Sequence, residues 1–206
     1  MEILKKISLV VLLVFAFNTI FAQQEDKVAK AFSDSYVHEK EKNYTAAAES
    51  MKKVYDASSY AINMRLGWLT YMAAQYNTSL TYYQICIRLM PLSIEARMGY
   101  VYPASALGNW DLVLAKYAEI LKIDPNHYYA NLYSGQIYTK QKQYKKADKY
   151  YTVLLNHFPF TYEIVIAAAW NDYYLGKYRE AKVLFQKALW LYPNDKSASE
   201  GLKLVN

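Results

Sequence analysis

Residues 128–161 read YYANLYSGQIYTKQKQYKKADKYYTVLLNHFPFT, and this 34-residue block decides the fold because it recurs along the chain. The recurrence is clearest in four prolines spaced 34 residues apart: Pro91, Pro125, Pro159 and Pro193. An aromatic residue precedes each proline by fifteen positions, at Tyr76, Trp110, Tyr144 and Tyr178. Another precedes it by eight, at Tyr83, Tyr117, Tyr151 and Phe185. Repeats of this length are typical of solenoids, so the repeat predicts the architecture before any single motif is considered.

Within one block, the apolar residues have helical spacing. Tyr178, Ala181, Phe185, Ala188 and Leu189 fall on one face of a helix, and the next proline ends that helix. Upstream, Gly108-Asn109 and Gly176-Lys177 indicate a turn between two helices. Each block is therefore predicted to be helix–turn–helix–turn.

This pattern resembles the tetratricopeptide repeat family, and residues 128–161 match it best, through Ser134-Gly135, Tyr138, Tyr144, Ala147, Tyr151 and Pro159. The resemblance implies an all-α, right-handed superhelical solenoid of about five repeats, with a concave groove lined by the first helix of each repeat. We expect this solenoid to cover residues 23–206. Its repeats are placed at 28–59, 60–93, 94–127, 128–161 and 162–195, and a capping helix at 196–206.

The N-terminus predicts a secretory signal peptide over residues 1–22. Two lysines, Lys5 and Lys6, precede an apolar run from Ile7 to Phe17, and a small residue, Ala22, stands before a polar stretch. We expect cleavage after Ala22, no stable membrane insertion afterwards, and export to the periplasm or medium of a Gram-negative bacterium. The alternative is a retained anchor, for which the apolar run is short.

Composition excludes several chemistries. A single cysteine among 206 residues rules out a disulfide framework and cysteine-based metal sites. The histidines, His38, His127 and His157, are scattered without partners at metal spacing. Cys86 stands in an apolar helix position and is interpreted as core packing. We therefore predict no enzyme activity, no catalytic residues, no metal and no cofactor.

The family resemblance also implies which side chains line the groove. Mapped one by one, the candidates are aromatic, methionine or leucine: Phe32, Tyr36, Met64, Trp68, Tyr71, Met98, Tyr102, Tyr129, Leu132, Trp170 and Tyr173. Two interpretations stay open, because aromatic stripes at helical spacing fill cores as well as binding surfaces. The Lys and Asn with which some family members clamp acidic tails are replaced by Phe32 and Tyr36 in the first repeat. Arg65 and Arg97 could pair with a carboxylate, but we expect them to be solvated, because exposed ion pairs contribute little.

These features favour an exported, non-catalytic scaffold that binds a protein or peptide segment in envelope assembly. The alternative is a glycan-binding protein of polysaccharide export or surface attachment, since Tyr and Trp also stack on sugars. A net charge of +6 is too small and too widely spread to favour nucleic acid, and we predict none. Self-association into a homo-oligomer stays open. Pro103, four residues after Gly99 in the third repeat, predicts a kink or break in its helix.

Overall fold

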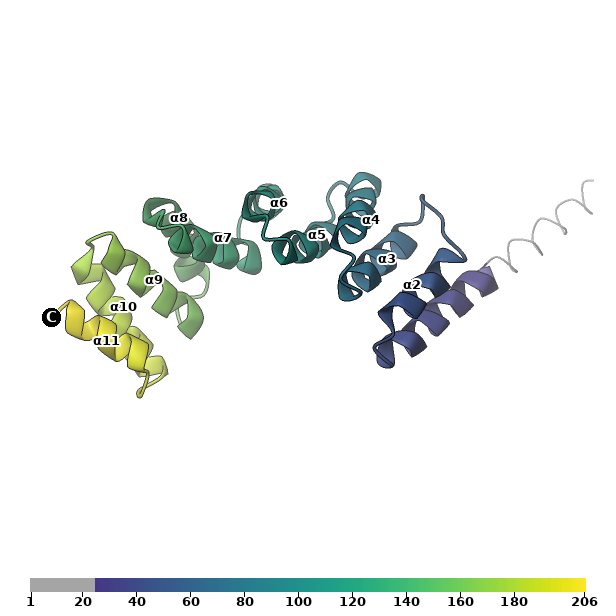
Figure 1. Cartoon of the computed structure of the whole chain (residues 1–206). Helices are drawn as coiled ribbons and strands as arrows, with labels where there is room; N and C mark the ends of the chain where they lie inside the picture. The colour runs from purple at the N-terminus through teal and green to yellow at the C-terminus, as the bar shows by residue number, and fades with distance from the viewer. Residues whose placement is uncertain (1–24) are drawn as a thin grey trace, which may run out of the picture. The chain divides into compact units, whose positions relative to one another are not determined.

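The computed structural model describes residues 25–206, and every regular element in that range is an α-helix. The first helix covers residues 25–40 of the described part. The helices after it, labelled in Figure 1, are α2 (Tyr44–Lys52), α3 (Tyr60–Met72), α4 (Tyr76–Leu89), α5 (Ile94–Ala106), α6 (Trp110–Ile123), α7 (Tyr128–Lys140), α8 (Tyr144–His157), α9 (Tyr162–Tyr174), α10 (Tyr178–Leu191) and α11 (Lys196–Leu204). The prediction of an all-α fold of about five repeats and a C-terminal helix is confirmed. The predicted signal peptide lies outside the described residues.

The described residues divide into two compact units, with the boundary between Leu107 and Gly108. In its described part, unit 1 holds the helix over residues 25–40 and α2 to α5, and unit 2 holds α6 to α11. Inside each unit a helix packs on the next helix along the chain. The first helices of successive pairs also touch, α3 with α5 in unit 1, and α7 with α9 and α9 with α11 in unit 2. Packing on nearest neighbours is how a repeat array buries its apolar faces.

Polar side chains start many of the helices. Asn43, Ser59, Ser93, Asn109 and Asp195 each accept a hydrogen bond from the backbone N–H three residues on, and His127 does so through Nδ1. Such caps satisfy donors that the first helical turn leaves free. Within residues 25–206, no helix has the length and apolar character needed to cross a membrane.

The turn inside each helical pair uses a residue with left-handed backbone conformation. Two of these residues are glycines, Gly108 with a φ of 70° and Gly176 with a φ of 75°. Both stand where the sequence predicts a turn between two helices. Lys42, Ala74 and Lys142 supply the left-handed conformation elsewhere, with φ of 58° to 59°. The following N–H then bonds back five residues, as from Gln75 to the Thr70 carbonyl at 2.8 Å. This arrangement ends a helix by satisfying its last carbonyls, so the fold accepts some left-handed strain at non-glycine residues.

The aromatic residue in the middle of the second helix packs against glycine in the first helices. The Tyr83 ring of α4 lies between Gly67 of α3 and Gly99 of α5. A β-carbon built on Gly67 would stand 2.9 Å from the Tyr83 ring, and one on Gly99 would overlap that ring. In unit 2 the Tyr151 ring lies on Gly135, and the Phe185 ring lies on Gly201. Close contact of a ring with bare backbone therefore joins neighbouring helices in both units.

The predicted break at Pro103 is wrong. Helix α5 runs unbroken from Ile94 to Ala106, and the Pro103 carbonyl still accepts a bond from the Leu107 N–H at 3.1 Å. Pro103 lies in the last helical turn, where its missing N–H costs a single hydrogen bond. Its ring and Ala104 are buried, so packing overrides the local preference. The Tyr83 ring lies against Gly99, so a side chain at this position would overlap it.

We predict that Gly99→Ala lowers the free energy of unfolding by about 1–3 kcal/mol, because the added methyl group overpacks against the Tyr83 ring. In a Tyr83→Ala background the same change becomes neutral or stabilising, since alanine favours a helix over glycine by about 0.5–1 kcal/mol. Urea denaturation of the four proteins, followed by circular dichroism, measures this cycle. If Gly99→Ala changes stability equally in both backgrounds, the destabilisation does not come from contact with the Tyr83 ring.

Candidate functional site

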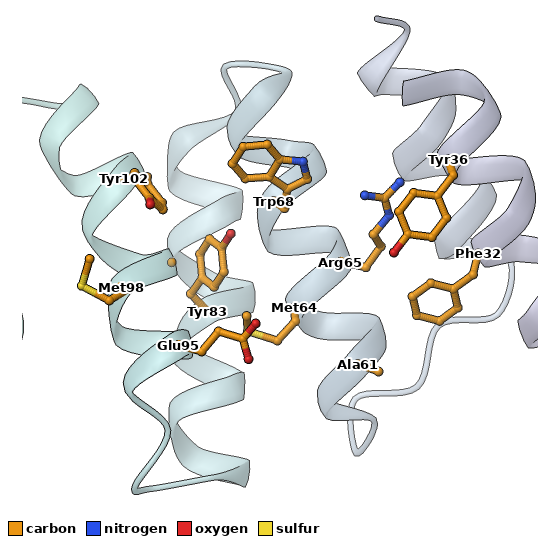
Figure 2. A pocket seen from close by; sticks show the side chains of 11 residues that line it. Phe32, Tyr36, Ala61, Met64, Arg65, Trp68, Tyr83, Glu95, Met98 and Tyr102 are labelled. Carbon is orange, nitrogen blue, oxygen red and sulfur yellow. The ribbon is translucent and has the colours of Figure 1, made fainter. Parts of the chain in front are cut away.

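Unit 1 contains a hollow of about 410 Å³ between its helices. Figure 2 shows its lining, which comes from the helix over residues 25–40 and from α3, α4 and α5. The lining residues are Phe32, Tyr36, Ala61, Met64, Arg65, Trp68, Tyr83, Glu95, Met98, Gly99 and Tyr102. Six of them belong to the groove set predicted from the sequence: Phe32, Tyr36, Met64, Trp68, Met98 and Tyr102.

A buried polar network fixes one wall of this hollow. Glu39 accepts a 2.6 Å hydrogen bond from the Trp68 indole N–H and pairs at 2.6 Å with the Arg65 guanidinium. Arg65 also donates from Nε to the Ser35 hydroxyl at 3.0 Å, and its guanidinium lies 3.9 Å from the centre of the Tyr36 ring. The Arg65 side chain is 7% exposed. Charge-assisted bonds of this kind hold side chains in one orientation, so Trp68 and Tyr36 are preorganised.

Methionine and ring contacts form the rest of the lining. Met64 packs against the core cluster of Cys86, Ile87 and Ala96, and Met98 lies near Tyr102 on α5 in Figure 2. Tyr71, which does not line the hollow, has its ring centre 5.9 Å from that of Trp68 and 5.7 Å from that of Tyr102. Six of the seven candidates of unit 1 therefore line one hollow, and the seventh, Tyr71, contacts the rings of Trp68 and Tyr102.

Some side chains of this lining are packed in the core, and others are exposed at the surface. Phe32 and Trp68 pack against the core cluster around Leu66 and Met51, and the same side chains face the hollow. Tyr36 and Tyr102 are 56% and 46% exposed. An apolar hollow with aromatic residues at its margin is the usual form of a site that accepts an apolar group.

The four candidates in unit 2 have different surroundings. Tyr129 is exposed and stacks on Tyr133, with 5.9 Å between ring centres. Trp170 donates its indole N–H to the Ser197 hydroxyl at 2.8 Å and meets the ring of Tyr173 edge-on. Leu132 is 1% exposed and belongs to the core cluster of α7 to α9. It therefore presents no surface to a ligand in this structure.

The expectation of solvated arginines is wrong. Arg65 and Arg97 are each 8% exposed. Arg65 pairs with Glu39, and Arg97 donates to the Ser93 carbonyl at 2.9 Å. Sequence reasoning missed Glu39 because its partners lie 26 and 29 positions away on another helix. Its place three residues after Tyr36, on the same helical face, was the available signal.

Cys86 is fully buried, as predicted, and its thiol points to the Tyr60 carbonyl at 3.7 Å. Burial raises the pKa of the Cys86 thiol to about 12, so the reactive thiolate is scarce at neutral pH. Among residues 25–206, no three His, Cys, Asp or Glu side chains lie close enough together to hold a metal ion.

Two stretches of unit 2, residues 129–161 and 167–195, match the sequence model of the tetratricopeptide repeat family. These stretches are tetratricopeptide repeats. No curated protein matches the chain as a sequence relative. Among solved structures, a tetratricopeptide repeat protein from Parabacteroides merdae ATCC 43184 aligns with a TM-score of 0.73 and 19% identity, over 87% of this chain and 72% of its own.

Structures of MamA are also similar. One has a TM-score of 0.70 at 15% identity, covering 81% of this chain and 92% of the other. MamA from Desulfovibrio magneticus RS-1 has a TM-score of 0.64 at 18% identity, covering 74% of this chain and 85% of the other. At these identities the likeness concerns the fold alone, a solenoid of paired helices like that of tetratricopeptide repeat proteins.

We predict that Glu39→Ala lowers the free energy of unfolding by about 3 kcal/mol, because the buried Arg65 guanidinium loses its counter-charge. Chemical denaturation of the variant measures this loss. Glu41→Ala is the matched control, since Glu41 is exposed and outside the network, and it is expected to change stability by less than about 0.5 kcal/mol. Equal effects of the two changes would show that the Glu39–Arg65 pair contributes nothing.

Proposed function

We propose that the protein is an exported, non-catalytic scaffold that holds an apolar segment of a partner protein in the unit 1 hollow. The supporting observation is the preorganised wall of the hollow, where Glu39 holds Trp68 and Arg65 in place. Trp68 is half-buried, and a tryptophan whose orientation is already fixed loses little entropy on binding, which favours affinity. Tryptophan, tyrosine and methionine are also the residues that contribute most at protein interfaces.

The size and polarity of the hollow indicate what it accepts. About 410 Å³ lies near the lower end of ligand pockets, roughly 300–1,000 Å³, and suits one or two large apolar side chains. Met64 on α3 and Met98 on α5 both line the hollow, and methionine side chains adapt easily to the shape of an incoming group. The partner segment is therefore expected to insert an aromatic or aliphatic anchor.

The setting we propose is the cell envelope. It rests on the N-terminal pattern of two lysines, an apolar run and Ala22, which is typical of export signals. An exported scaffold that presents an apolar hollow fits a role in assembling envelope proteins.

We predict that the double change Trp68→Ala/Tyr71→Ala abolishes capture of the partner in a cross-linked pull-down from envelope extract of the source bacterium. The reason is that the pair removes the indole wall of the hollow and the ring that braces it. Trp190→Ala is the control, because Trp190 is 77% exposed in unit 2 and lies outside the hollow. It is expected to leave capture unchanged. If the folded Trp68→Ala/Tyr71→Ala variant still captures the partner, the proposal that the unit 1 hollow binds it is wrong.

The glycan alternative has one observation of its own. A second hollow in unit 1, of about 420 Å³, is lined by Tyr55, Asn77, Thr78, Thr81, Tyr82 and Ile85, none of which is charged. The Tyr55 and Tyr82 rings meet edge to face with centres 6.0 Å apart, and Tyr55 is 44% exposed. Amide and hydroxyl groups beside an exposed ring suit a neutral sugar, whose hydroxyls need both donors and acceptors.

If this second hollow binds sugar, Tyr55→Ala and Asn77→Ala each weaken binding of neutral glycans on an array. The expected loss is about fivefold to tenfold, because each removes one contact worth about 1 kcal/mol. Trp68→Ala serves as the control and keeps glycan binding. Absence of binding to every neutral glycan by the unmodified protein would reject this alternative.

A further inference from the structure

A cluster of lysines surrounds the turn between α7 and α8 in unit 2. It consists of Lys140, Lys142, Lys145, Lys146 and Lys149. All five side chains are exposed, and the first four lie within seven residues of sequence. Three of them, Lys142, Lys145 and Lys146, line a hollow of about 410 Å³ together with Gln143, Tyr144 and Leu175. These five residues are called the lysine cluster below.

The positive charge of the lysine cluster is not compensated within the described residues. None of the five forms an ion pair there, and the nearest acidic residue in sequence, Asp148, is engaged by Lys177 at 2.8 Å. Lys146 lies 5.3 Å from the centre of the Tyr138 ring, which leaves its charge in place. Five like charges close together repel one another, so the cluster is costly unless an anion offsets it.

The fold itself does not require these lysines. The corresponding turn between α3 and α4 carries no charged residue between Leu66 and Ile87. Ala74 there has the same left-handed conformation as Lys142, with φ of 58° against 59°. Because an uncharged turn builds the same structure, the lysines of the α7–α8 turn are available for a role other than folding.

An apolar face lies directly beside the charges. The rings of Tyr144 and Tyr174 stack with centres 4.8 Å apart and planes 16° apart, and Leu175 closes the hollow next to them. Tyr174 is half exposed. One ligand could therefore contact both lysine charges and an aromatic surface in this hollow, whereas a small inorganic anion would use the charges alone.

We propose that the lysine cluster binds an extended acidic segment of a protein, with an aromatic residue of that segment seated against Tyr144 and Leu175. Lys145 and Lys149 are one helical turn apart, which is about 6 Å along α8. Alternate side chains of an extended chain are about 6.6 Å apart on one face, so carboxylates at alternate positions match this spacing. The site is in unit 2 and does not depend on the hollow of unit 1.

The test uses the full chain and a fluorescent peptide with glutamate at alternate positions and phenylalanine next on the same face, Ala-Glu-Ala-Glu-Ala-Glu-Ala-Phe. Fluorescence anisotropy measures its dissociation constant. The variant Lys142→Gln/Lys145→Gln/Lys146→Gln is expected to bind about tenfold more weakly, through the loss of three exposed charge pairs. The same peptide with glutamine in place of glutamate is expected to lose its affinity for the unmodified protein.

A matched control removes the same charge elsewhere. Lys27→Gln/Lys53→Gln/Lys203→Gln changes three exposed lysines outside the cluster and should leave the dissociation constant within about twofold, because exposed charges that do not pair with the peptide contribute little in salt. Equal weakening by both triple variants would overturn the proposal. So would tighter cluster-dependent binding of anionic lipid vesicles, a single-stranded oligonucleotide or an acidic polysaccharide. The Trp68→Ala/Tyr71→Ala variant should bind the acidic peptide normally, so failure of the unit 1 groove and failure of the lysine cluster are distinguishable.

Discussion

The contact between an aromatic ring and helix backbone is the constraint on which the rest of the structure depends. The Tyr83 ring reaches α3 and α5 at once because Gly67 and Gly99 carry no side chain. A single ring thereby fixes the distance between two first helices and the helix that joins them. In unit 2, Tyr151 and Phe185 make the corresponding contacts with Gly135 and Gly201. Since each repeat packs only on its neighbours, this local contact sets the geometry of a whole unit.

The unit 1 hollow is a consequence of that contact. Tyr83 and Gly99 belong to its lining, so the ring that joins the helices also helps to line the hollow between them. Another wall of the hollow contains Trp68 and Arg65. The Glu39 carboxylate binds both, accepting a hydrogen bond from the Trp68 indole and pairing with the Arg65 guanidinium. These contacts fix the orientation of the Trp68 and Arg65 side chains before any ligand is present.

The unit 1 hollow and the lysine cluster of unit 2 are built from different kinds of side chain. The hollow of unit 1 combines apolar side chains with the polar contacts of Glu39 to Trp68 and Arg65. The lysine cluster of unit 2 uses charge on a turn whose backbone is the same as that of the neutral α3–α4 turn. In this chain the ring contacts join the helices, while the residues of the turns differ in charge from one repeat to the next.

The sequence by itself determined the helices, their pairing by repeat and the burial of Cys86, because the period of 34 and the 3.6-residue periodicity are local properties of the chain. It also named most of the side chains that line the unit 1 hollow. Only the tertiary structure decided the course of α5 through Pro103, the burial of the two arginines and the place of Leu132 in the core. Arg65 depends on Glu39 from another helix, and Leu132 packs with residues of α8 and α9. Such partners are set by packing between helices rather than by spacing along the sequence.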